Sequence, residues 1–172
     1  RNVTGVQTCA LPIFELTLIL ANEMLSAAKI KPKIDPSTAL KNGAAMDVWR
    51  KMIKAQGGDT DAPLPVAKEN IEVKAESAGV LSSLDALKVG VSAWRLGAGR
   101  QKQGDLLQHG AGIEIHIKPG EKVKVGQTVL TLYTDEASRF ERALDALKGS
   151  FTIADESTKV NQLPLILERI ES

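Results

Sequence analysis

The chain has 172 residues and a mass of 18.4 kDa, which is enough for one domain, or a small domain with part of another, and excludes a large multidomain enzyme. Lys and Arg number 22 against 21 Asp and Glu, and only 3% of the residues are aromatic. This composition disfavours nucleic acid as a partner, because such a surface needs basic patches and stacking rings. The longest apolar stretch, residues 16–21, is too short to span a bilayer, so we expect a soluble cytoplasmic protein that does not bind a membrane.

Residues 1–13 do not read like protein sequence. Residues 3–13 spell VTGVQTCALPI, which is what eleven codons of a common DNA-sequencing adapter encode. We therefore interpret residues 1–13 as a non-native, adapter-derived segment and expect the authentic sequence to start near Phe14. The only cysteine, Cys9, lies in this segment, and a single cysteine cannot form an internal disulfide.

Residues 14–58 are predicted to be helical. Residues 14–29 lack Gly and Pro and are apolar around most of a helix circumference, so this helix needs burial on several sides. Asp35 and Pro36 predict the start of a second, amphipathic helix over residues 37–56, with Trp49 on its buried face. We interpret residues 14–58 as the helical end of a larger α/β domain and the polar, proline-containing residues 59–70 as a linker.

Residues 71–172 change to the period-2 pattern of strands. The expected strands cover residues 71–75, 78–81, 112–117, 122–125, 129–133 and 151–154, with an edge strand at 163–170. Two helices are predicted among them. The first starts after Asp85, carries Trp94 on its buried face and ends at Gly97. The second covers residues 134–148 and has three inward side chains, Phe140, Leu144 and Leu147. The fold class is therefore α+β.

One glycine-rich loop could carry chemistry, namely Leu96-Gly97-Ala98-Gly99-Arg100 with Gly104 beyond it. A phosphate-binding loop follows a strand and opens a helix, whereas this loop follows a helix. The position favours a helix C-cap over an anion site. Arg95 and Arg100 are accordingly interpreted as packing or loop-anchoring residues.

His116 shares a strand face with Glu114, and two side chains at this spacing could in principle share a metal ion. A third ligand is missing, because His109 is the only other histidine, so we favour a solvated strand face. No serine lies in a GxSxG turn, and the carboxylates form no recognisable catalytic pair. The residues themselves predict no catalytic, cofactor-binding or metal-binding position.

Several segments together resemble one family. VSAWRLGAGR at residues 91–100, AGIE at 111–114 and KPGEKVKVGQTVLTLYTD at 118–135 resemble the C-terminal region of thymidine phosphorylase and the related pyrimidine-nucleoside phosphorylases. Upstream, ELTLILANEML and MIKAQGGD resemble the stretch that leads into that region. The resemblance covers nearly all of residues 14–172. It implies that residues 71–172 form an α/β hammerhead whose β portion is a barrel-sandwich similar to biotinyl and lipoyl domains.

The resemblance also implies an activity, the reversible phosphorolysis of thymidine to thymine and 2-deoxyribose 1-phosphate in pyrimidine salvage. Such a pentosyltransferase is a homodimer that needs phosphate and a pyrimidine nucleoside and no cofactor. The family's phosphate-binding and base-binding motifs match nothing in residues 14–172, so no catalytic residue is carried over and the chain alone is expected to be inactive. We expect the loop Leu96, Gly97, Ala98, Gly99 and Arg100 to face the interdomain cleft and help to close it.

Three alternatives stay open. The first is a broad-specificity pyrimidine-nucleoside phosphorylase, because the base pocket that decides between nucleosides is not represented. The second is a biotinyl or lipoyl carrier, although neither Met-Lys-Met nor Asp-Lys-Ala occurs and the helix at 85–96 is foreign to a minimal carrier. The third is an interaction module without catalysis.

Overall fold

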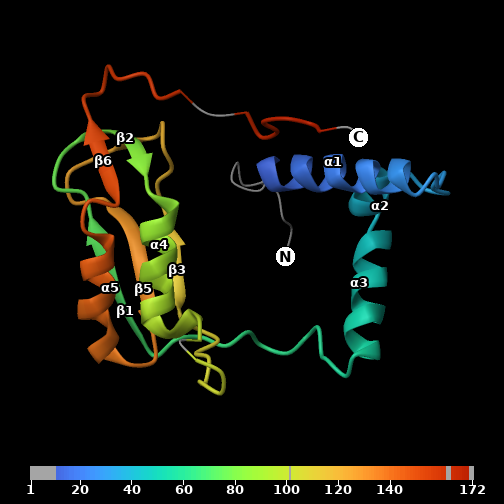
Figure 1. Cartoon of the computed structure of the whole chain (residues 1–172), viewed down its shortest axis with the longest axis horizontal. Coiled ribbons are helices and arrows are strands. Elements are labelled where there is room, and N and C mark those ends of the chain that lie inside the picture. The colour runs from blue at the N-terminus through green and yellow to red at the C-terminus, as the bar shows by residue number, and fades with distance from the viewer. Residues whose placement is uncertain (1–10, 101, 162–163, 171–172) are drawn as a thin grey trace. The chain divides into compact units, whose positions relative to one another are not determined.

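The computed structural model describes residues 11–100, 102–161 and 164–170 and falls into two compact units (Figure 1). The first unit holds the residues up to Ala62 and those from Leu163 onward, and the second holds Pro63–Gln162. Helices and antiparallel sheets occur together, which confirms the predicted α+β class.

The first unit begins with α1, Leu11–Ala27, three residues earlier than predicted. Its C-terminus is closed by two backbone bonds, from Lys29 N–H to the Ser26 carbonyl and from Ile30 N–H to the Leu25 carbonyl, both 3.0 Å. These bonds form a Schellman motif, and they require the left-handed φ of 54° at Lys29. Leu11 to Ile13 belong to the segment interpreted as adapter-derived, and residues 1–10 lie outside the described residues, so that interpretation stays a prediction.

The predicted helix over residues 37–56 is two helices, α2, Pro36–Lys41, and α3, Ala44–Ala55. The Asp35 carboxylate caps α2 as predicted, accepting from the Ser37 N–H at 2.9 Å. A single continuous helix was wrong because Gly43 adopts a left-handed φ of 86° and the Asn42 side chain accepts from the Ala44 N–H at 3.0 Å. This short polar side chain starts a new helix where the periodicity alone gave no break.

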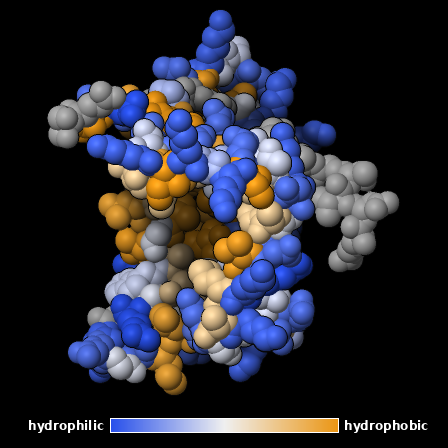
Figure 2. Space-filling view, turned by 90° about the vertical axis from the view of Figure 1, so that its right-hand side faces the viewer, coloured by the Kyte–Doolittle hydropathy of each residue, from blue (hydrophilic) through white to orange (hydrophobic). Residues whose placement is uncertain are grey.

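The first unit has no core of its own among its described residues, because none of the buried hydrophobic side chains falls before Ala75. Trp49, predicted to be buried, is 45% exposed. Figure 2 is the view from the right-hand side of Figure 1, where α3 is drawn, and hydrophobic side chains are visible at the surface there.

The second unit contains two antiparallel three-stranded sheets. The first sheet has the order β1-β5-β3, formed by β1, Glu69–Lys74, β5, Thr128–Thr134, and β3, Gly112–Ile115. The second has the order β4-β2-β6, formed by β4, Lys122–Val123, β2, Gly79–Leu84, and β6, Phe151–Ala154. All six strands fall at predicted positions.

Two helical segments pack beside the first sheet in Figure 1. The first is α4, Ala86–Ala93, capped by Asp85 as predicted and continued by the π-helical turn η1, Trp94–Ala98. The second is the 3-10 turn η2, Ala137–Arg139, followed by α5, Phe140–Leu147. The buried Ser92 hydroxyl donates to the Ala143 carbonyl at 2.9 Å and joins α4 to α5. The buried core is continuous and comprises Ala75, Leu81, Leu96, Ile117, Val123, Val129, Leu130, Leu132, Ala143 and Leu147.

Four predictions for the second half of the chain are corrected. Thr134 ends β5 rather than starting a helix, because its hydroxyl is used to bond the Leu96 carbonyl. Leu144 is 39% exposed, and the fully buried residue of α5 is Ala143, since the helix starts later and its inner face is rotated. The described residues 164–170 contain no strand, and Trp94 is 38% exposed rather than part of the core.

Candidate functional site

The glycine loop is shaped by two close approaches. Gly97 has a left-handed φ of 112°, and a Cβ there would lie 2.9 Å from the Gln108 Cδ. A Cβ on Gly99 would lie 2.6 Å from the Trp94 ring, and the same ring donates through Nε1 to the Arg100 carbonyl at 3.0 Å. The Trp94 ring therefore packs against the loop rather than in the core. Glycine is required at positions 97 and 99 because a side chain there would meet Gln108 or Trp94.

Gln108 connects this loop to the end of β5. Its Oε1 accepts from the Thr134 hydroxyl at 2.9 Å and from the Asp135 N–H at 2.8 Å, while its Nε2 donates to Glu136 at 2.6 Å. Its backbone N–H donates to the Gly97 carbonyl at 3.1 Å. One side chain thus uses both ends of its amide to hold segments that lie far apart in sequence.

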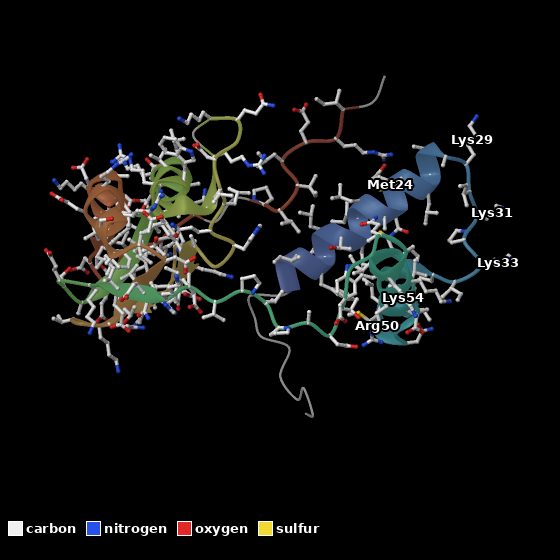
Figure 3. All side chains as sticks on the ribbon, turned by 90° about the horizontal axis from the view of Figure 1, so that it is seen from below. Met24, Lys29, Lys31, Lys33, Arg50 and Lys54 are labelled. Carbon is white, nitrogen blue, oxygen red and sulfur yellow. The ribbon has the colours of Figure 1, made fainter. Side chains whose placement is uncertain are left out.

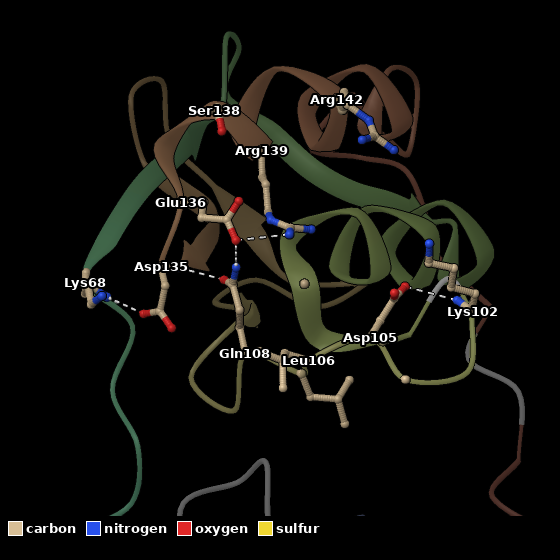
Figure 4. Close-up of a pocket in the computed structure, with 14 residues that line it drawn as sticks. Lys68, Lys102, Asp105, Leu106, Gln108, Asp135, Glu136, Ser138, Arg139 and Arg142 are labelled. Carbon is tan, nitrogen blue, oxygen red and sulfur yellow. Dashed lines mark hydrogen bonds and ion pairs between the residues drawn. The ribbon is translucent and has the colours of Figure 1, made fainter.

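A pocket of about 880 Å³ opens beside this network, entirely within the second unit (Figure 4). It is lined by the glycine loop, by the end of β5 with η2, and by the start of α5. The charged residues of its lining are four cations and three carboxylates, namely Lys68, Lys102, Arg139, Arg142, Asp105, Asp135 and Glu136.

Each carboxylate of the pocket is engaged by a local donor. Asp135 accepts from the Lys68 N–H at 3.1 Å, and Asp105 accepts from the Lys102 N–H at 3.0 Å. The Arg139 guanidinium donates to Glu136 at 3.0 Å and lowers the pKa of that carboxyl below its ordinary value of 4.5, with the Gln108 amide adding to the effect. The lowered pKa keeps the Glu136 carboxyl ionised, and paired with Arg139, to a lower pH than an isolated glutamate.

Comparison with known proteins shows which family the chain resembles in sequence. Residues 80–154 match the family model described as the pyrimidine nucleoside phosphorylase C-terminal domain. The thymidine phosphorylase of Mycobacterium tuberculosis is 46% identical to this chain over 158 residues, which cover 92% of the chain and 36% of that protein. The chain belongs to the pyrimidine-nucleoside phosphorylase family.

Other relatives agree. The pyrimidine-nucleoside phosphorylase of Bacillus subtilis is 38% identical over 133 residues, covering 72% of the chain and 31% of that protein. That of Staphylococcus epidermidis is 32% identical over 166 residues, covering 91% of the chain and 37% of that protein. The chain thus spans about a third of the length of the curated relatives it matches.

The loop singled out from the sequence lies partly at the pocket, and Ala98 and Arg100 are not among the residues that line it. Gly97 and Gly99 line it, while Leu96 is fully buried beneath it. Arg95, in η1, joins that turn to α5 through a 2.7 Å bond to the Arg142 carbonyl, which agrees with its predicted packing role. The carbonyl of Arg100 accepts the Trp94 bond. Whether this loop closes a cleft in a longer family member stays a prediction.

Sequence reasoning missed Gln108, Glu136 and Arg139. The only local signal was the spacing of Glu136 and Arg139, which suits an ion pair one turn apart. Gln108 and Glu136 are 28 residues apart, and no pattern in the sequence joins them.

His116 directly follows β3, and its Nε2 is 2.7 Å from the Thr131 hydroxyl and 3.9 Å from the Glu114 carboxylate. Glu114 also accepts from the Tyr133 hydroxyl at 2.8 Å and raises the pKa of that tyrosine above its ordinary value of 10.0. Within residues 11–100, 102–161 and 164–170, no three His, Cys, Asp or Glu side chains are grouped so that they could hold a metal ion. None of the helices there could cross a bilayer.

A second group of cations lies in the first unit (Figure 3). Lys29, Lys31 and Lys33 are exposed in the turn after α1, and Arg50 and Lys54 lie on α3. Arg50 is 3.6 Å from the Asp47 carboxylate in an exposed pair of small energetic weight. This group has the character of a solvated surface.

Proposed function

We propose that this chain is the C-terminal part of a thymidine phosphorylase, which converts thymidine and phosphate to thymine and 2-deoxyribose 1-phosphate. The observation that carries the proposal is the 46% identity to a thymidine phosphorylase over 92% of the chain. The pyrimidine-nucleoside phosphorylases reach 32% and 38%, which favours thymidine over a broader nucleoside range.

In this reaction a phosphate oxygen forms a bond to the anomeric carbon of the sugar while the glycosidic C–N bond breaks. The departing pyrimidine takes the bonding electron pair and a proton. The transition state has oxocarbenium character, so rate depends on fixing the phosphate and the base on either side of the sugar. The residues that do this in the family have no match in residues 14–172, so the chain alone should release no thymine.

The contribution proposed for this chain is structural. Residues 71–172 form the α/β hammerhead with its barrel-sandwich, an assignment supported by two antiparallel sheets that carry two helical insertions. Residues 14–58 belong to the central α/β domain, and residues 59–70 link the two. A partner for residues 14–58 accounts for the lack of a buried hydrophobic residue in that part of the described chain. The complete enzyme is proposed to be a cytoplasmic homodimer.

The glycine loop Leu96-Gly97-Ala98-Gly99-Arg100 is proposed to help the interdomain cleft of the complete enzyme to close. Its support comes from Trp94 and Gln108, which hold the loop in one shape beside an open pocket. Closing elements of this kind exclude water and complete a site only if their geometry is fixed.

A chimera tests the assignment. In the Mycobacterium tuberculosis thymidine phosphorylase, the matching segment is replaced by residues 14–172 of this chain, and thymine release from thymidine and phosphate is followed. The chimera should release thymine, because the retained part supplies the phosphate and base sites and residues 14–172 supply the matching C-terminal part. A folded chimera that releases no thymine would overturn the proposal. Sequencing the source DNA upstream of the Phe14 codon is an independent check, which should reveal the phosphate and base motifs.

The loop is tested in the same chimera with Gly99→Val. The added side chain meets the Trp94 ring, so the loop must move, and kcat/KM should fall by about a hundredfold. Gly90→Val is the matched control, because a Cβ there meets nothing within 4 Å. Unchanged turnover in Gly99→Val would exclude a closing role for the loop.

A further inference from the structure

Several hydrogen-bond donors of the pocket beside the glycine loop have no acceptor among the described residues. The Lys68 and Lys102 ammonium groups and the Arg142 guanidinium make no bond or ion pair there. The Arg139 Nε is buried and also lacks a partner. A buried donor without an acceptor is costly, and a guanidinium N–H more so than a neutral one.

The carboxylates of the pocket accept hydrogen bonds from other donors. Asp135 and Asp105 each accept from a backbone N–H, and Glu136 is held by Gln108 and by the other end of the Arg139 guanidinium. Arg139 Nε is closed off from solvent and from a ligand in the pocket, so the donors available to a ligand are the exposed ones of Lys68, Lys102 and Arg142. Arg139 and Arg142 are three residues apart around the start of α5, and both line the pocket.

We propose that this pocket binds a small oxyanion of the phosphate class. Guanidinium groups hold phosphate oxygens through paired, charge-assisted hydrogen bonds, and an ammonium adds a point charge. Gly97, Gly99 and Gly104 form part of the wall and present no side chain that would block a ligand. The volume of about 880 Å³ leaves room beyond the anion, next to carboxylates that can accept from hydroxyl groups.

Two sources of this chemistry fit, inorganic phosphate and a phosphorylated sugar. The sites of both would share the cations, but only a sugar uses the carboxylates. The proposal concerns binding to this chain, so it does not depend on turnover. Its failure would leave the proposed phosphorylase function intact, and an inactive chimera would leave the anion site intact.

The test is a titration of the complete 172-residue chain, labelled with nitrogen-15, at constant ionic strength set with chloride. Inorganic phosphate and 2-deoxyribose 1-phosphate are the two probes, and their binding is followed by the shifts of the backbone amides and of Arg142 Nε. Both should give saturable shifts confined to residues 97–108 and 135–142. Tighter binding of the sugar phosphate identifies the phosphorylated sugar as the ligand, and equal binding identifies free phosphate; either supports the site.

Arg142→Gln removes a guanidinium that has no described partner and should weaken phosphate binding by roughly tenfold or more. Lys148→Gln is the matched control, because Lys148 lies on the same segment of chain outside the pocket and pairs with Asp145. The phosphate affinity of Lys148→Gln should equal that of the unsubstituted chain. Shifts that do not saturate, that spread over all the lysines, or that are the same in both variants would overturn the proposal.

Discussion

Gln108 is the residue on which the pocket wall depends most. Replacing it with Leu keeps the approximate volume but removes all its amide bonds, leaving the Asp135 N–H without its acceptor. We expect the free energy of unfolding to fall by about 1–3 kcal/mol, measured by urea denaturation. Gln127→Leu is the control, since that side chain makes a single bond to an exposed turn, and it should cost less than about 1 kcal/mol. Equal losses would show that the network adds no stability.

Glu136 makes the second residue-scale prediction, a pH dependence. Because its bond to Arg139 lowers the pKa of the folded carboxyl below 4.5, the ionised form is favoured by folding. This contribution is complete above the ordinary pKa near 4.5 and is lost as pH falls through the lower, folded value. A carboxyl carbon-13 NMR titration should place the midpoint of Glu136 below 4.5.

Glu136→Gln should flatten the loss of stability on acidification without removing it, because other carboxylates with lowered pKa values remain, among them Asp145 beside Lys148. A titration midpoint at or above the ordinary value would mean that the Arg139 contact does not form in solution.

At the scale of elements, sequence patterns predicted the strands and turns whose positions depend only on neighbouring residues. Alternation located the strands, and Gly120 and Gly126 turn the chain with left-handed φ values of 94° and 77° where turns were expected. The errors occurred where a distant partner decides. Thr134 looks like a helix cap but bonds Leu96, and Trp94 looks like a core residue but bonds Arg100.

The contact between β2 and β6 yields a third prediction. Gly79 has a φ of 156°, and a Cβ there would collide with the Ala154 carbonyl oxygen across the strand pair. Gly79→Ala should therefore destabilise the second unit by about 3 kcal/mol or more, because neither backbone can move without breaking the pairing. Gly90→Ala, in open space on α4, should stabilise it by roughly 0.5–1 kcal/mol. Thermal unfolding followed by circular dichroism compares them, and a neutral Gly79→Ala would contradict the close approach.

At the scale of the whole molecule, the two units should differ in stability. Every buried hydrophobic residue among those described lies in the second unit, whereas α1 to α3 expose much of their apolar surface. Limited proteolysis should therefore cut first before Pro63 and leave a resistant product close to Pro63–Gln162. Mass spectrometry of the products checks this. Equal resistance of both units, or a single product cut inside the sheets, would show that the core is distributed differently.

Only part of the site was predictable, because several of its residues depend on partners that are distant in sequence. Glycines mark a loop in any sequence, so residues 96–104 stood out. The meaning of the charges around that loop depends on which partners the fold supplies, and Gln108, Glu136 and Arg139 gain theirs only after β5 is in place.

The position of Trp94 beneath Gly99 has an optical consequence. The chain has two tryptophans, and Trp49 lies in the other unit, so Trp49→Phe leaves one indole whose emission comes from beneath the loop. Any displacement of the loop breaks the bond from Nε1 to Arg100 and exposes more of the ring to water, which should shift its fluorescence to longer wavelength. Trp94 is thus a built-in, label-free reporter, which can follow this loop in real time during mixing experiments.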